Sequence, residues 1–257
     1  MTIRTDSSLL HRAMALPRSV LNLLAVLGLS AALTGCGEML SNPRVADADN
    51  NQVITIGDSI FALSGEIQQN LQAAAGQTFR QYTVSGSYLS GGFFATSIVD
   101  QYAIARSDNA DITTVVMDGG GNDILFPVIL FDPHQCKTEW YRFGRLSSKC
   151  QAFIDDIYIE AVTFLNEMEA DGVENVIYLG YYYTKNGLFR LASLKEAIDY
   201  GDQALARACA NSTVNCTFVD PRSSIVNKDI IFDGIHPNST GSRKIADLIW
   251  PHLQPLL

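Results

Sequence analysis

Ser59 has the sequence surroundings of a serine nucleophile. It lies in Gly57-Asp58-Ser59-Ile60, between a β-branched run at residues 53–56 and a helical pattern at residues 64–75. A serine on a small-residue turn from a strand into a helix presents its Oγ to a substrate. Turns rich in Gly, Asp and Ser also occur for purely structural reasons. The tetrapeptide therefore indicates catalysis only if partners for Ser59 occur elsewhere in the chain.

His236 and Asp233 can supply those partners. They lie three residues apart in Asp233-Gly234-Ile235-His236-Pro237. One turn of chain can therefore bring the carboxylate to the imidazole Nδ1 and leave Nε2 for Ser59. His236 alone among the histidines has a nearby acid in a loop at a predicted helix start; the others are His11, His134 and His252.

Two further segments can supply hydrogen-bond donors for a developing oxyanion. Asn122 follows the apolar run at residues 111–117, and Gly86 follows the run at residues 79–84. In open parallel α/β sheets, the carboxyl ends of the strands meet at one edge, where ligands bind. The predicted strands therefore deliver Ser59, Gly86 and Asn122 to the same edge, where His236 can join them.

The strands and helices that position these residues alternate along the chain. Strands are predicted at residues 53–56, 79–84, 111–117, 175–180 and 216–219, and helices at residues 64–75, 96–106, 151–170, 191–210 and 239–253. Ser64 is the expected N-cap of the first helix. Residues 131–150 show no period and hold two cysteines, which indicates an insertion closed by a disulfide. This alternation predicts a single α/β domain with a five-stranded, mostly parallel sheet covered on both faces.

The chain resembles the SGNH, or GDSL-type, hydrolase family in four short blocks within residues 50–250. The blocks are Gly57-Asp58-Ser59-Ile60, with Ile60 where the family usually has Leu, then Ser85-Gly86, Gly120-Gly121-Asn122-Asp123 and Asp233-Gly234-Ile235-His236-Pro237. Each block is weak alone, and their order and spacing carry the resemblance. It implies a flavodoxin-like, three-layer α/β/α sandwich.

The resemblance also implies a role for each matched residue. Ser59 would be the nucleophile, His236 the general base and then acid, and Asp233 the residue that orients His236. The oxyanion hole would combine the backbone N–H groups of Ser59 and Gly86 with the side-chain amide of Asn122. Such donors stabilise an oxyanion without titrating.

Several neighbouring residues allow two interpretations. Asp58 and Asp123 could be catalytic acids, but turn and cap hydrogen bonds that hold Ser59 and Asn122 are favoured. The tyrosines at 181–183 could line an acyl or sugar pocket or could serve as packing. A zinc site at His134 and Cys136 is disfavoured because neither a second nearby histidine nor C-x-x-C spacing accompanies it. The chemistry needs no metal or cofactor.

The N-terminus has the pattern of a bacterial lipoprotein signal. Arg4, Arg12 and Arg18 precede an apolar run at residues 20–33, which ends in Leu33-Thr34-Gly35-Cys36. This pattern predicts a signal peptide at residues 1–35, lipid on Cys36, a tether at residues 36–51 and the hydrolase domain at residues 52–257. An ordinary signal peptide or an uncleaved anchor is the alternative. Gly37 favours the outer membrane of a Gram-negative envelope.

Charge and cysteine content narrow the function further. Residues 1–35 hold three of the eighteen basic and one of the twenty-seven acidic residues, so the remaining chain has a net charge of −11. That balance disfavours nucleic-acid binding and adhesion to anionic lipid. The four remaining cysteines of an exported chain suggest two disulfides, and proximity favours Cys136–Cys150 and Cys209–Cys216.

These observations predict a serine ester hydrolase that works through an acyl-enzyme. It would act on small-molecule esters with short to medium acyl groups, as a carboxylesterase or a lysophospholipase-like enzyme. One alternative is a carbohydrate O-acetyl esterase, which uses the same residues with a different pocket. Another is a non-catalytic binding lipoprotein of the cell envelope. The sequence leaves the oligomeric state open.

Overall fold

The computed structural model describes residues 43–92, 95–138 and 144–257. The predicted signal peptide, Cys36 and the first part of the predicted tether lie outside these residues. Among the described helices, none is long and apolar enough to cross a membrane.

Five parallel strands form one sheet in the order β2-β1-β3-β4-β5. The strands are β1 (Asn50–Ile56), β2 (Phe79–Gln81), β3 (Thr114–Met117), β4 (Asn175–Leu179) and β5 (Asn215–Val219). In register, Ile56 of β1 pairs with Met117 of β3, and Met117 pairs with Tyr178 of β4. The carboxyl ends of the three central strands are thus level, and the residues that follow them share one edge.

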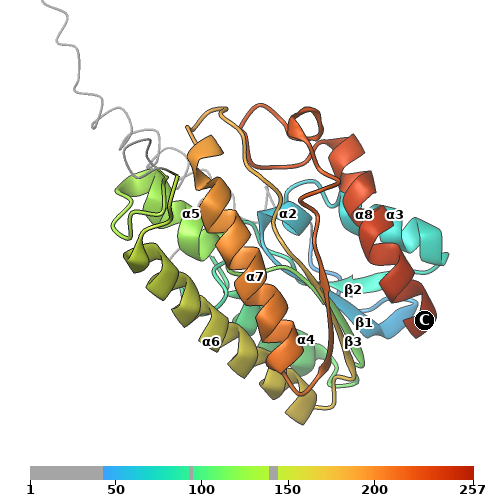
Figure 1. Cartoon of the computed structure of the whole chain (residues 1–257). Coiled ribbons are helices and arrows are strands. Elements are labelled where there is room, and N and C mark those ends of the chain that lie inside the picture. The colour runs from blue at the N-terminus through green and yellow to red at the C-terminus, as the bar shows by residue number, and fades with distance from the viewer. Residues whose placement is uncertain (1–42, 93–94, 139–143) are drawn as a thin grey trace, which may run out of the picture.

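Helices cover both faces of the sheet (Figure 1). One face carries α4 (Ile98–Asp108), α6 (Ser148–Ala170) and α7 (Lys195–Asn211), and the other carries α3 (Glu66–Ala75) and α8 (Ser239–Leu253). Successive strand residues enter opposite cores: Val115 packs toward α4 and α6, and Val116 toward α3 and α8. Both faces are therefore apolar, as the continuous hydrophobic strands predict. The three-layer α/β/α fold is confirmed.

The other helices of the described residues are α2 (Ser59–Ala62), α5 (Gly121–Leu130), η2 (Ala192–Leu194), η3 (Asn227–Asp229) and η4 (Gln254–Leu256). Helix α5 is not predicted by the sequence pattern. Its sequence, GNDILFPVIL, has no polar face that would give a helical period, and it contains Pro127. Gly120 precedes α5 with a φ of 94°, a conformation that glycine adopts without steric cost.

The structure differs from the prediction at several boundaries, among them the start of α3 and the end of the predicted tether. Helix α3 begins at Glu66, and its N-cap is Gly65 in the left-handed region rather than Ser64, whose Oγ accepts a 3.3 Å bond from the Glu66 N–H. The end of the predicted tether packs on the domain: Val45 and Gln81 exchange two backbone hydrogen bonds, and Arg44 forms an ion pair with Asp108. The segment around Val45 that pairs with β2 is too short to show a periodic pattern in the sequence, so this contact was not predictable.

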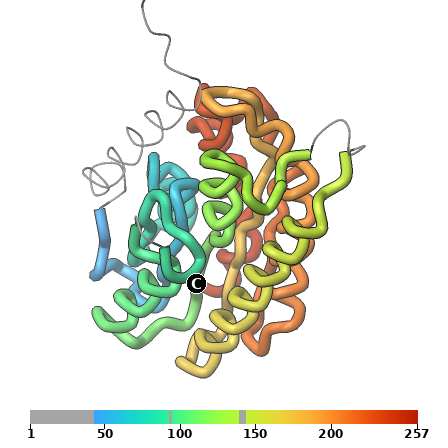
Figure 2. The backbone as a smooth tube through the Cα atoms, turned by 90° about the vertical axis from the view of Figure 1, so that its left-hand side faces the viewer, coloured from blue at the N-terminus to red at the C-terminus, as the bar shows by residue number. Residues whose placement is uncertain are grey.

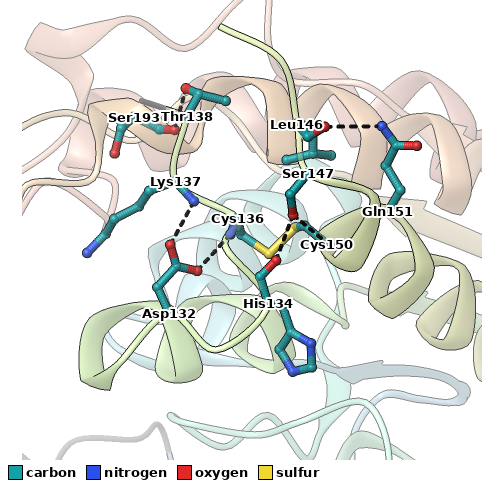
Figure 3. The surroundings of a disulfide bond; sticks show 10 residues. All are labelled: Asp132, His134, Cys136, Lys137, Thr138, Leu146, Ser147, Cys150, Gln151 and Ser193. Carbon is teal, nitrogen blue, oxygen red and sulfur yellow. Dashed lines mark hydrogen bonds between the residues drawn. A yellow bond between two sulfur atoms is a disulfide. The ribbon is translucent and has the colours of Figure 1, made fainter. Parts of the chain in front are cut away.

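Both predicted disulfides are formed. Cys136–Cys150 closes the insertion between α5 and α6, and Cys209–Cys216 joins the end of α7 to β5. Figure 3 shows how hydrogen bonds hold the first disulfide: the Asp132 carboxylate accepts from the Cys136 N–H, and Ser147 Oγ accepts from the Cys150 N–H. The Thr138 N–H also donates to the Ser193 carbonyl, so the insertion is fixed to η2, directly before α7.

Candidate active site

Ser59, His236 and Asp233 form one chain of hydrogen bonds. Nε2 of His236 lies 2.8 Å from Ser59 Oγ, and its Nδ1 lies 2.5 Å from Asp233 Oδ2. Ser59 begins α2 directly after β1, and the other two residues lie in the loop before α8. This geometry lets the imidazole take a proton from the hydroxyl while the carboxylate fixes its orientation.

The turn that carries Ser59 is held from several sides. Gly57 has a φ of 154°, and a Cβ there would clash with the Asp118 carboxylate. Its backbone N–H and C=O both bond to the Gln101 side chain, at 2.8 and 3.1 Å. Asp58 caps α2, because its Oδ1 accepts a 2.9 Å bond from the Ile60 N–H. Ser59 is therefore placed by a turn of fixed conformation.

The loop that carries His236 is fixed by Asp233 and Tyr182. The backbone N–H groups of Ile235 and His236 donate to Asp233 Oδ1 at 2.8 and 3.1 Å. Burial alone would raise the pKa of Asp233, but the hydrogen bonds from His236 and these N–H groups outweigh it and hold the pKa below its usual value. The Tyr182 hydroxyl donates to the Ile235 carbonyl at 2.6 Å. Asp233 is thus a carboxylate at neutral pH.

The structure brings Asn122 and the Gly86 turn to the same edge as Ser59. Asn122 is buried, and its Nδ2 donates a 2.9 Å bond to the Ser87 carbonyl. The Val84 N–H donates to the Gly57 carbonyl at 3.0 Å, which ties the turn containing Gly86 to the turn before Ser59. A primary amide has two donor hydrogens, so Asn122 keeps one for a ligand. The backbone of Gly86 adopts a φ of 84°, which favours glycine.

A buried pair of carboxyl groups, Asp58 and Asp118, lies at the turn that carries Ser59, and no sequence motif indicates a role for Asp118. The Asp58 N–H donates to Asp118 Oδ1 at 2.6 Å, and both side chains are buried. Burial, and then the negative charge of Asp58, raise the pKa of Asp118 well above its usual value. Asp118 supports the turn through the hydrogen bond that it accepts from the Asp58 N–H. Its position directly after a buried central strand is the sequence signal that could have identified it.

Asp123 also forms a supporting hydrogen bond. Its Oδ2 accepts a 3.0 Å bond from the Leu89 N–H, and burial raises its pKa to about 7. The structural interpretation of Asp58 and Asp123 thus agrees with their contacts. Each side chain bonds a backbone N–H near Ser59 or Asn122.

The three consecutive tyrosines differ in position. Tyr181 lines a pocket beside Ser59, and its ring packs so closely on Gly121 that a Cβ at Gly121 would collide with it. Tyr182 also borders this pocket and binds Ile235, whereas Tyr183 donates to Asp199 at 2.6 Å. Pocket lining and packing therefore both apply to Tyr181 and Tyr182.

The pocket extends from Ser59 and Asn122 into the space between the sheet edge, α5, α6 and α7. Its volume is about 830 Å³, part of which is open to solvent. In both views of the molecule α6 and α7 lie side by side (Figures 1 and 2). Most of the walls are apolar side chains of these helices and of η2, namely Ile124, Leu125, Ile154, Ile157, Tyr158, Leu194, Ala197, Ile198, Ala204 and Leu205.

The described residues contain no group of three or more His, Cys, Asp or Glu side chains placed to hold a metal ion. Cys136 is bonded to Cys150, and the ring of His134 stacks on Phe153 at 4.0 Å between centroids. His134 and Cys136, which lie close in sequence, therefore offer no thiolate to a metal ion.

Comparison with known proteins identifies the fold. No family model matches the chain, and no curated protein matches it. Among solved structures, a carbohydrate esterase of family 3 from Talaromyces cellulolyticus is 20% identical, with a TM-score of 0.53 over 79% of this chain and 96% of that one. A carbohydrate acetylesterase family member from Sinorhizobium meliloti is 14% identical, with a TM-score of 0.56 over 80% and 99%.

A third solved structure, the aryl esterase of M. smegmatis, is 13% identical, with a TM-score of 0.51 over 80% of this chain and 99% of that one. At these identities the likeness establishes the fold. The expected three-layer α/β/α architecture is thus confirmed.

Proposed function

We propose that the protein is a serine ester hydrolase that forms an acyl-enzyme on Ser59. The observation that carries the proposal is the hydrogen-bonded chain from Ser59 through His236 to Asp233, with distances of 2.8 and 2.5 Å. A nucleophile, a base within reach of its proton and a group that orients the base are the parts that acyl transfer requires.

In the first half-reaction Ser59 Oγ attacks the ester carbonyl carbon while its proton passes to His236 Nε2. The tetrahedral intermediate then expels the alcohol, whose oxygen takes that proton from His236. Water attacks the acyl-enzyme in the second half-reaction, with His236 again receiving and returning the proton, and the carboxylic acid leaves. The ionised Asp233 stabilises the imidazolium in both halves.

The negative charge on the carbonyl oxygen requires donors that are already in place. The backbone N–H groups of Ser59 and Gly86 and the amide of Asn122 serve as these donors in the proposed mechanism. The hydrogen bond from Asn122 to the Ser87 carbonyl supports this set of donors, because the bond joins the segment of Asn122 to the segment of Gly86. Such prepositioned donors stabilise an oxyanion without reorganisation during the reaction.

Fluorophosphonate labelling tests the proposal directly. The wild type should be labelled at Ser59 and should hydrolyse p-nitrophenyl esters, and Ser59→Ala should lose both properties. Ser64→Ala is the matched control, because Ser64 is exposed and lies in the turn just after α2. Labelling at another serine, or wild-type turnover by Ser59→Ala, would refute the mechanism. A wild type that takes no label would favour the non-catalytic binding protein.

A carbohydrate O-acetyl esterase is the second candidate. The names of two of the similar structures, both carbohydrate esterases, favour it. The same nucleophile would then act on acetylated sugars, and a panel of acetylated sugars beside p-nitrophenyl esters separates the two substrate classes.

We also propose that the enzyme is an exported lipoprotein anchored through Cys36, at the outer membrane or facing the periplasm of a Gram-negative bacterium. The sequence pattern of residues 1–36 supports this location. Two disulfides in the domain are consistent with an oxidising compartment. The acyl chains would hold the acidic domain at the membrane.

A further inference from the structure

We propose that the pocket between α5, α6 and α7 binds the acyl chain of a medium-chain ester, with an acyl group from hexanoyl to decanoyl. The inference rests on the proposed function, because it assigns the substrate class of the same Ser59. The same pocket is lined by Ser59 and by side chains of these three helices. The pocket is partly open to solvent, so a substrate can enter it from outside.

Small residues on α7 leave room for this pocket. Ala197, Gly201 and Ala204 recur at the four- and three-residue spacing that places side chains on one helix face. A Cβ built on Gly201 would meet only one atom within 4 Å, Ile124 Cδ1 at 3.9 Å. A side chain at Gly201 would therefore extend into open space rather than into packed atoms.

The wall offers few polar partners to a sugar. Oxygen atoms at five positions already have hydrogen-bond or ionic partners within the protein, namely Tyr158, Tyr181, Tyr182, Thr184 and Asp202. A carbohydrate in the pocket would find few free partners for its hydroxyl groups, and each hydroxyl group left unpaired costs free energy. A hydrocarbon chain needs no such partners and gains from burial.

The position of the pocket relative to His236 favours the acyl group over the alcohol. The leaving alcohol takes its proton from His236 Nε2 and therefore lies on the His236 side of Ser59. Ser59 and Asn122 line the pocket, whereas the His236 and Asp233 side chains do not. The substituent that enters the pocket from the carbonyl carbon is thus the acyl chain.

The length of the pocket wall limits the length of the acyl chain that the pocket can hold. Pocket residues on α7 run from Ala197 to Leu205, a rise of roughly 12 Å at 1.5 Å per residue. An extended polypeptide advances about 3.6 Å per residue over three backbone bonds, which is on the order of 1.2 Å per bond. An extended acyl chain with the same advance per bond covers the distance in roughly ten bonds. This estimate sets decanoyl as the upper limit.

The test compares kcat/KM for p-nitrophenyl acetate, butyrate, hexanoate, octanoate and decanoate. The wild type should prefer octanoate to acetate. Gly201→Ala, Gly201→Leu and Gly201→Phe should lower the octanoate-to-acetate ratio in steps, by at least about tenfold for the two larger side chains. Gln203→Phe is the control, because Gln203 is exposed on the same helix and does not line the pocket.

A second measurement is independent of turnover: decanoate binding to Ser59→Ala, measured by calorimetry. Binding that weakens at least tenfold in Ser59→Ala/Gly201→Leu supports the inference, and absence of decanoate binding overturns it. An unchanged octanoate-to-acetate ratio in folded Gly201→Leu also overturns it, even if Ser59 is labelled. If the wild type hydrolyses no ester and takes no label, the proposed function fails, and decanoate binding alone decides the pocket.

Discussion

The Tyr181 hydroxyl donates a 2.9 Å hydrogen bond to Oδ2 of Asp58, the residue that caps the helical turn beginning at Ser59. The two residues are 123 positions apart in the chain. This contact connects the end of β4 to the nucleophile turn after β1. It makes Tyr181 a positioning residue for Ser59 as well as part of the pocket wall.

Tyr181→Phe should therefore lower both stability and reactivity. Loss of one partner of a buried carboxyl group should lower the free energy of unfolding by about 1–3 kcal/mol. The fluorophosphonate labelling rate of Ser59 should also fall in the folded variant, because the turn is less firmly held. Tyr200→Phe removes a hydroxyl that bonds the half-exposed Asp155, and it should leave the labelling rate unchanged. Equal labelling rates for the two variants would contradict the positioning role.

Asn122→Ala should reduce kcat with little change in KM. Removal of one oxyanion donor typically costs about 2.7–4 kcal/mol of transition-state stabilisation, or roughly 10²–10³ in kcat. Asn175→Ala is the control, because Asn175 begins β4 at the opposite edge of the sheet. Steady-state kinetics on p-nitrophenyl butyrate measure both variants. A change in KM alone would show that Asn122 binds substrate without stabilising the transition state.

Asp123 should make stability depend on pH. Its folded pKa of about 7 lies above the ordinary 3.8, so between these values the folded state holds a proton that the unfolded state releases. Its contribution to stability is therefore present at low pH and is lost as pH rises through about 7. The slope has an upper limit of roughly 1.4 kcal/mol per pH unit.

Asp123→Asn keeps a side-chain oxygen for the Leu89 N–H and removes the ionisation. Urea unfolding at pH 5 and pH 8 should show the variant gaining stability relative to wild type at the higher pH. Asp247→Asn changes an exposed aspartate of α8 and should show no such gain. Parallel pH profiles for wild type and Asp123→Asn would rule out this origin of the dependence.

The cysteines should be fully oxidised in exported protein. Cys136–Cys150 and Cys209–Cys216 have Cα–Cα distances of 5.1 and 5.0 Å, within the usual range for disulfides. Mass analysis after alkylation without reduction should find no modified thiol among these four residues. The loops would contribute about 3 and about 2.5 kcal/mol in the chain-entropy model, so reduction should lower the unfolding midpoint. Alkylation of all four in the non-reduced protein would exclude both bonds.

Cys36→Ser should change the location of the activity. Without a lipidated cysteine the esterase should appear in the soluble fraction or remain as an unprocessed precursor. Fractionation with immunoblotting and an esterase assay distinguishes these outcomes from wild type. A processed variant that stays with membranes as the wild type does would show that lipid on Cys36 is not the attachment.

The sequence by itself determined the parallel sheet and the segments that carry the site. These features are local: alternation of strands and helices predicts the topology, and the three-residue spacing of Asp233 and His236 lies within one loop. The inward residues of α6, such as Ile154 and Leu165, recur with a helical period in the sequence and are buried. The disulfides were also predictable, because both join cysteines close in sequence.

Only the tertiary structure decided how the site is supported and what it can hold. The bonds from Asp118 and Tyr181 to the Ser59 turn join segments 60 and 123 residues apart, and no periodic pattern encodes such pairs. Helix α5 has no polar face to reveal it. Gly201 is an ordinary helical residue in the sequence, and it becomes part of a pocket because α5, α6 and α7 enclose unfilled space beside it. That space depends on side chains from three separate helices, so its size is fixed by packing.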